Sequence, residues 1–218
     1  PVSPATTGAS DEGESLRAAL GKASTHSGYL LLFAGFFVCG FHVAFIATHM
    51  PAYLTDNGIS GAVSATALSL IGIFNIFGSL IFGRLGDRYR KKYLLSLLYF
   101  ARAVVIVLFL ALPLSNVTAV AFGGAIGFLW LATVPLTSGT VAQIFGSRYL
   151  STLYGIVFLG HQLGAFLGVW LGGRLYAAGG SYTPVWIAAI ALGIFAGLVH
   201  LPIKDQPYPR SSAAQAIP

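Results

Sequence analysis

Six long apolar runs constrain the fold of this chain more than any other feature of its sequence. They cover residues 28–54, 60–83, 92–113, 116–138, 150–173 and 181–202. A bilayer core about 30 Å thick needs roughly 20 apolar residues in helical conformation, and each run is long enough. The predicted fold class is therefore an all-α membrane protein with six transmembrane helices.

The composition supports the membrane interpretation. Only 8% of the 218 residues are charged and 56% are hydrophobic, whereas soluble domains carry about 25% charged residues. Eighteen charges cannot cover a solvated surface of this size, which excludes a soluble globular domain, a disordered chain and a nucleic-acid-binding protein. The single cysteine, Cys39, excludes a disulfide framework and a cysteine-based metal site. No cofactor or metal is expected.

The positive charges predict an orientation. If both ends of the chain lie on one side, ten of the twelve Lys and Arg residues share that side, leaving only Arg174 opposite and Arg102 within the third run. The positive-inside rule then places both ends in the cytoplasm, in the cell (inner or plasma) membrane. Residues 1–27 are predicted to be a cytoplasmic linker, disordered to about Asp11 and with a short helix through Ser15 to Ala23. Residues 203–218 are predicted to be a cytoplasmic tail.

The loop after the second run carries a recognisable motif, GRLGDRYRKK at residues 83–92. It resembles the cytoplasmic signature of the major facilitator superfamily, G-x-L-x-D-R-x-G-R-R/K. Arg90 stands where the family usually has glycine. A glycine lets two helices cross closely, and a carboxylate that pairs with arginine can bias one state of a two-state carrier. The matching residues, expected to act as a conformational switch, are Gly83, Leu85, Asp87, Arg88, Lys91 and Lys92.

This resemblance implies one half of a twelve-span protein built from two six-span repeats. The polar leading segment and the absence of an initiator Met favour the C-terminal half, with a six-helix N-terminal half as the missing partner. The alternative is a complete six-span membrane protein that acts as a dimeric carrier or as a non-transport receptor. An enzyme is not expected, because the sequence has no metal-ligand or nucleophile–base pattern.

Within the superfamily, residues 35–54 and 154–176 resemble the monocarboxylate-permease group and its bacterial relatives. The likeness extends over about residues 28–205. It implies secondary active transport of a small organic anion of the monocarboxylate class, coupled to protons or exchanged for another anion, by alternating access. Characterised members generally have a substrate-binding arginine in the second span of this half, where this chain offers Asn75 and Ser79.

Polar residues inside the apolar runs are the candidate binding residues, since a polar group in hydrocarbon needs a partner or a function. Arg102 could hold an anion, but it could also snorkel or bond to a neighbouring helix. His161, with an ordinary histidine pKa of about 6.5, could take up a proton beside a carboxylate or simply bond to another helix. Asn75 has the same two interpretations. The predicted substrate-binding residues are Asn75, Arg102, His161, Gln162, His42 and Tyr154.

Local patterns give further expectations. Glycines at every fourth position from Gly160 to Gly172 predict a tight helix seam. Pro51 is expected to kink or end the first span. Tyr99 and Arg102, three residues apart, could face one partner, and Thr133 and Thr137 belong to a partly polar face around Pro135.

Overall fold

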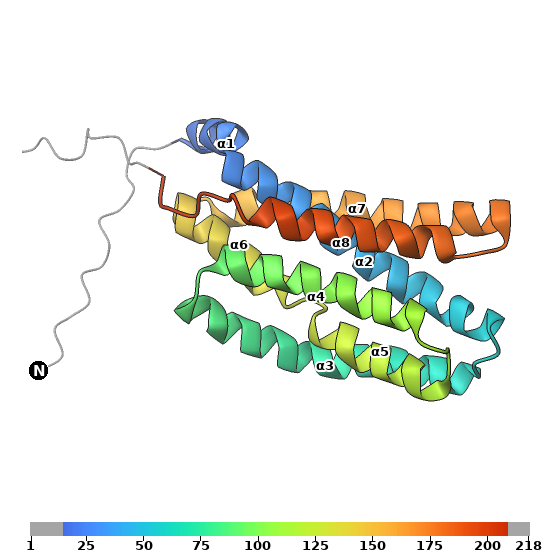
Figure 1. Ribbon diagram of the computed structural model, residues 1–218. Helices are drawn as coiled ribbons and strands as arrows, with labels where there is room; N and C mark the ends of the chain where they lie inside the picture. The colour runs from blue at the N-terminus through green and yellow to red at the C-terminus, as the bar shows by residue number, and fades with distance from the viewer. Residues whose placement is uncertain (1–14, 209–218) are drawn as a thin grey trace, which may run out of the picture.

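The computed structural model describes residues 15–208, which form eight helices and no strands (Figure 1). The helices are α1 (Leu16–Thr25), α2 (Ser27–Asp56), α3 (Gly61–Arg88), α4 (Lys91–Ala111), α5 (Asn116–Phe128), α6 (Thr133–Phe145), α7 (Leu150–Gly179) and α8 (Thr183–His200).

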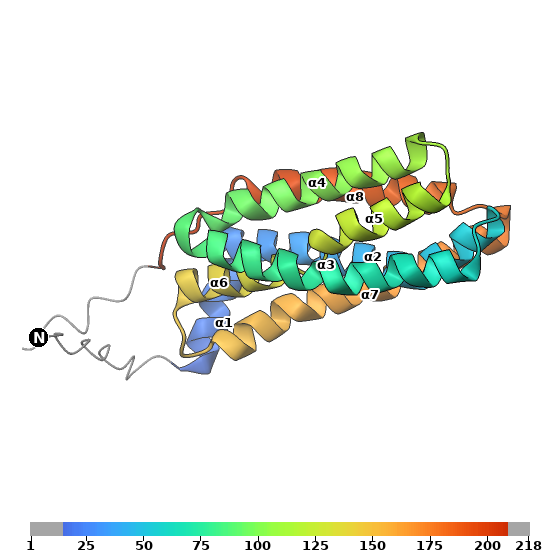
Figure 2. The same cartoon turned by 90° about the horizontal axis from the view of Figure 1, so that it is seen from below.

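These helices make six candidate membrane spans, which confirms the predicted fold class. The helices α2, α3, α4, α7 and α8 each make one span, and α5 and α6 together make the fourth. The long helices lie side by side in an elongated bundle, with both described chain ends at the same end of it (Figures 1 and 2). We call this the terminal end and the opposite one the far end.

The first two helices differ from expectation in one respect. The hydroxyl of Ser15 accepts from the Ala18 N–H at 3.3 Å and caps α1, so the short helix predicted here is present. The prediction for residues up to Asp11 lies outside the described residues. Pro51, however, does not end the first span, because α2 continues to Asp56. A proline removes only one helical hydrogen bond, and the buried Leu54 side chain anchors the turn that follows it.

The predicted glycine seam joins α7 to α2. A Cβ on Gly164 would collide with the Phe37 carbonyl of α2, and a Cβ on Gly168 would come within 2.6 Å of the Phe41 carbonyl. Glycine is therefore required for the two backbones to approach this closely. The seam prediction is confirmed, and it fixes the height of α7 relative to α2.

A second glycine contact holds α3 against the fourth span. A Cβ on Gly78 of α3 would collide with the Phe128 carbonyl at the end of α5. From the other side, a Cβ on Gly127 would lie 2.6 Å from the Ile71 Cα. The backbone of α3 is thus brought directly beside the point where α5 ends.

Candidate functional site

The fourth span is interrupted between α5 and α6. Residues 129–132 are not helical. Pro135 explains the position of this break, since proline has no N–H to donate and its ring collides with the carbonyl four residues earlier, that of Leu131. Proline is tolerated in the first turn of α6, where N–H groups lack intrahelical partners. The break leaves backbone groups that other side chains must satisfy inside the membrane.

Arg102, on α4, binds the carbonyl side of the break. Its Nη2 and Nε donate to the Leu129 carbonyl at 2.6 and 3.0 Å, and Nη2 also donates to the Trp130 carbonyl. The side chain is 1% exposed, and its guanidinium lies 5.2 Å from the ring centroid of Tyr99. A cation is favoured at a helix C-terminus. The carbonyls at the end of α5, which carry a partial negative charge, are thus the partners of the Arg102 guanidinium. No carboxylate among residues 15–208 pairs with it.

Asn75, on α3, binds the N–H side of the same break. Its Oδ1 accepts from the Leu131 N–H at 2.9 Å, and the Ser79 hydroxyl donates to the same oxygen at 3.3 Å. Two side chains from different helices therefore bind the same four-residue interruption. Arg102 donates to its carbonyls, and Asn75 accepts from one of its N–H groups.

Further polar side chains gather around Arg102. The thiol of Cys39, on α2, accepts from Arg102 Nη1 at 3.5 Å and lies 3.2 Å from the Thr133 hydroxyl on α6. Tyr154 and His161, on α7, interact electrostatically with the same thiol. We call this set the break cluster: Cys39, Tyr99, Arg102, Thr133, Tyr154 and His161.

Several polar atoms of the break cluster lack a hydrogen-bond partner among residues 15–208. By hydrogen-bond geometry they are the hydroxyls of Tyr99 and Tyr154 and the Nε2 of His161, although Tyr99 and His161 also have the Cys39 thiol as a polar neighbour. His161 Nδ1 lies 3.1 Å from Gln162 Oε1. Leaving a buried polar group unsatisfied costs about 1–3 kcal/mol, so such groups are uncommon. The cluster therefore contains two hydroxyls, an imidazole nitrogen and a positive charge whose hydrogen-bonding capacity the described residues use only in part.

Among the described residues, the bundle interior around Arg102 holds a positive charge and no carboxylate. The described carboxylates are Asp56, Asp87 and Asp205, and each lies near a helix end or beyond it. Arg102 is thus a buried positive charge that has no carboxylate partner in residues 15–208. A negatively charged ligand would gain from this potential, which acts strongly where water is excluded.

The six predicted binding residues are placed in three ways. Arg102, Tyr154 and His161 belong to the break cluster, and Gln162 adjoins it. Asn75 lies on the other side of the break. His42, 1% exposed, has its Nε2 2.8 Å from the Ala189 carbonyl and so faces α8.

Cys39 was not anticipated as a member of the cluster. A lone cysteine in an apolar run gives no sequence signal, because it behaves as a small apolar residue. The spacing of Tyr99 and Arg102 and the polar face containing Thr133 did point toward this region.

The signature motif lies at the terminal end and is mostly helical. α3 continues to Arg88, and two residues separate it from α4. A Cβ on Gly83 would meet no atom within 4 Å in the described part of the chain, whereas one on Gly86 would lie 2.6 Å from the Leu136 side chain of α6. In this part of the motif it is therefore Gly86, and not Gly83, that has a side chain of α6 packed against it.

Arg90, at the position where the family has glycine, holds the segment after α8. Its guanidinium donates twice to the Asp205 carboxylate, at 2.6 and 3.2 Å. This hydrogen bonding lowers the pKa of Asp205 from its ordinary value of 3.8. Lys92 Nζ donates to the Ile203 carbonyl at 2.9 Å and Gln143 Nε2 to the Asp205 carbonyl at 2.7 Å. The segment is thereby tied to both the signature loop and α6.

Other signature residues make fewer contacts. Lys91 Nζ donates to Gln143 Oε1 at 3.4 Å. Asp87 and Arg88 are exposed, and within residues 15–208 Asp87 makes no ion pair. Leu85 packs at the edge of the buried core.

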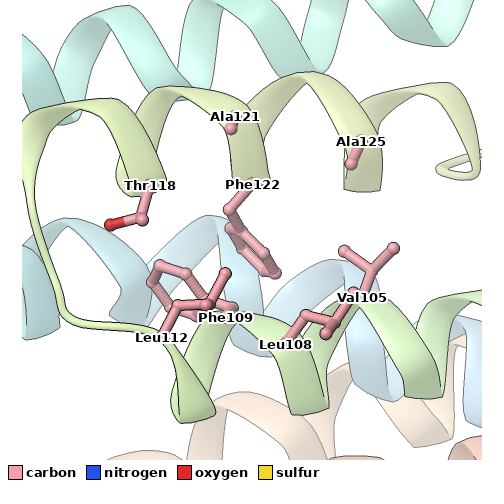
Figure 3. A pocket seen from close by; sticks show the side chains of 8 residues that line it. All are labelled: Val105, Leu108, Phe109, Leu112, Thr118, Ala121, Phe122 and Ala125. Atoms are coloured by element: carbon pink, nitrogen blue, oxygen red, sulfur yellow. The ribbon is translucent and has the colours of Figure 1, made fainter.

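A hollow between α4 and α5 lies apart from the break cluster. In Figure 3, side chains of the two helices face one another across it, and Thr118 carries the polar side chain among them. None of the predicted binding residues lines it, so it is not the candidate site. Its lining residues are Val105, Leu108, Phe109, Leu112, Thr118, Ala121, Phe122 and Ala125.

The six candidate spans, the fourth of them interrupted, define a multi-pass helical membrane protein. The chain belongs to the Major Facilitator Superfamily, whose model matches residues 32–218. This confirms the resemblance found in the sequence, and transport across a membrane is accordingly the activity of its class.

Relatives agree with this assignment. The chain is 28% identical over 183 residues to the uncharacterized MFS-type transporter YcxA of Bacillus subtilis, covering 81% of this chain and 44% of that protein. It is 29% identical over 187 residues to monocarboxylate transporter 12 of Rattus norvegicus, covering 81% and 38%. It is 26% identical over 126 residues to the uncharacterized MFS-type transporter YhjX of Escherichia coli, covering 58% and 31%. The chain thus spans less than half the length of these relatives.

Proposed function

We propose that this chain is the C-terminal half of a secondary carrier for a small organic anion of the monocarboxylate class. A six-helix N-terminal half would complete the substrate cavity, and the two halves would rock around it to give alternating access. The observation that carries the proposal is the buried charge of Arg102, which has no carboxylate partner among residues 15–208, beside the Tyr99 and Tyr154 hydroxyls, which make no close hydrogen bond there. The similarity to monocarboxylate transporter 12 supports the substrate class.

The break cluster would bind the anion in distinct ways. Arg102 supplies the attracting charge, and the hydroxyls of Tyr99 and Tyr154 donate to the carboxylate. His161 takes up a proton at Nε2 while Gln162 holds Nδ1, which lets the anion travel with a proton or be exchanged for another anion. Asn75 and His42 flank the cluster on α3 and α2.

The same proposal assigns an orientation. The terminal end, which carries the signature loop and the described chain ends, faces the cytoplasm, and the far end faces outward. Motion of the signature loop relative to α6 then accompanies opening toward the cytoplasm. The membrane is the cell's inner or plasma membrane.

Uptake by cells that express the full-length protein tests the substrate class. Uptake of a labelled monocarboxylate should be inhibited by unlabelled monocarboxylates and not by the corresponding neutral amides. Tyr154→Phe should raise KM with surface expression intact, because it removes one hydroxyl donor. Tyr176→Phe, on the same helix near the far end, is the matched control. Equal inhibition by amides and carboxylates would contradict an anion site.

A further inference from the structure

Side chains from two different helices hold the interruption of the fourth span. Within residues 15–208, the residues of the break are the only hydrogen-bonding partners that the two side chains share. Arg102 binds the carbonyls of Leu129 and Trp130, and Asn75 binds the N–H of Leu131. Three consecutive residues are thus fixed by α4 and α3 together.

We propose that Arg102 and Asn75 form a two-sided clamp that positions the fourth-span break, and through it the polar face of α6 in the break cluster. This inference rests on the proposed function, whose anion site it deepens. The clamp sets where Thr133, the first residue of α6, stands relative to Cys39. Arg102 and Asn75 are therefore positioning residues, and Arg102 acts in this way in addition to supplying charge.

The geometry of Arg102 supports a positioning role. Its Nε and Nη2 are occupied by backbone carbonyls, and Nη1 has the Cys39 thiol as a partner. A lysine at the same place keeps the charge but presents a single ammonium, which cannot reproduce a planar fork across adjacent carbonyls. Charge and clamp can consequently be separated by one substitution.

The placement of Asn75 supports the same role without any charge. Its oxygen is used by Leu131 and Ser79. The close approach of Gly78 to the Phe128 carbonyl holds this part of α3 beside the end of α5. The clamp therefore has a fixed backbone on its α3 side, and loss of the Asn75 oxygen would leave the Leu131 N–H unsatisfied in the membrane.

Cys39 provides a readout that is independent of transport. Its thiol is buried and in contact with Arg102 and Thr133, so it should react slowly with N-ethylmaleimide while the break is clamped. The test uses the full-length protein in membranes, with alkylation of Cys39 followed by mass spectrometry of its peptide. The variants are Arg102→Lys, Asn75→Ala and the double variant, and the controls are Arg174→Lys and Ser69→Ala, which lie outside the break.

Each single variant should raise the alkylation rate about fivefold, the change expected for about 1 kcal/mol. The double variant should be no more than about twofold faster than the larger single variant, because both side chains act through one break. Asn75→Asp keeps an oxygen acceptor, so Cys39 in this variant should be alkylated nearly as slowly as in the unmodified protein. This variant separates loss of the clamp from loss of folding. Unchanged rates in both single variants, or effects that multiply fully in the double variant, would overturn the proposal.

The outcome separates the clamp from the proposed function. If alkylation behaves as expected but no monocarboxylate is carried, the clamp stands and the substrate class is wrong. The other outcome is that monocarboxylates are carried, while Arg102→Lys has the same Cys39 alkylation rate and the same KM as the unmodified protein. Arg102 would then act by charge alone, and the clamp would be wrong.

Discussion

Arg102 and Leu129 are 27 residues apart in the chain, and the guanidinium of the first donates to the carbonyl of the second at 2.6 Å. The buried cation of α4 is thereby paired with the end of a broken helix. This relationship connects the energetics of the bundle to its candidate site, since the same side chain contacts the thiol of Cys39.

Arg102→Leu should destabilise the protein. The carbonyls of Leu129 and Trp130 would lose their donor in a buried position, at a cost of about 1–3 kcal/mol each. The apparent Tm in detergent should fall clearly, whereas Arg174→Leu, an exposed arginine of α7, should leave it nearly unchanged. An equal Tm for the two variants would mean that the carbonyls find other donors.

Gly164→Ala should disrupt the seam between α2 and α7. The added methyl group would collide with the Phe37 carbonyl, and such overpacking costs about 1–3 kcal/mol. Gly155→Ala is the matched control on the same helix, because a Cβ there would meet no atom within 4 Å. The apparent Tm should fall only for Gly164→Ala; similar values for both would contradict the seam.

Several features of the fold were predictable from the sequence because they depend on residues close together in the chain. Length and apolarity defined the spans, and glycines at every fourth position defined the α7 seam. The fourth-span break was hidden in one continuous apolar run, although Pro135 was its local signal. The partners of Arg102 could not be predicted, because they are backbone carbonyls. Every residue has a backbone carbonyl, so the residue type carries no information about which one accepts the hydrogen bond. The same holds for Arg90 and Asp205, which are 115 residues apart.

The pairing of Arg90 with Asp205 should make stability sensitive to acid. Hydrogen bonding by Arg90 lowers the pKa of the Asp205 carboxyl below 3.8, so its stabilising contribution is present above the unfolded pKa and is lost as the pH falls through the folded pKa. The apparent Tm of the unmodified protein should fall more steeply below about pH 4 than that of Asp205→Asn. Asp87→Asn, at an exposed carboxylate, is the control and should keep the steep fall. Parallel curves for the unmodified protein and Asp205→Asn would contradict a role for this pair.

The proposed orientation can be tested with single cysteines on the two ends of the bundle. Ser147→Cys, between α6 and α7, should react with a membrane-impermeant thiol reagent only after cells are permeabilised. Asn116→Cys, at the start of α5 at the far end, should react in intact cells. Both positions are exposed, so accessibility of the side chain is matched. The reverse labelling pattern would place the terminal end outside.

We propose that the break cluster binds an anion and, in the proton-coupled form of the proposed function, that movement of the anion is linked to a proton at His161. The most direct measurement is uptake of a labelled monocarboxylate at about pH 5.5 and about pH 7.5, on either side of the ordinary histidine pKa. The unmodified protein should show faster uptake in acid, and His161→Ala should lose this stimulation with surface expression intact. His49→Ala, a histidine of α2 outside the cluster, should retain it. Acid stimulation that is unchanged in His161→Ala would contradict proton coupling at His161.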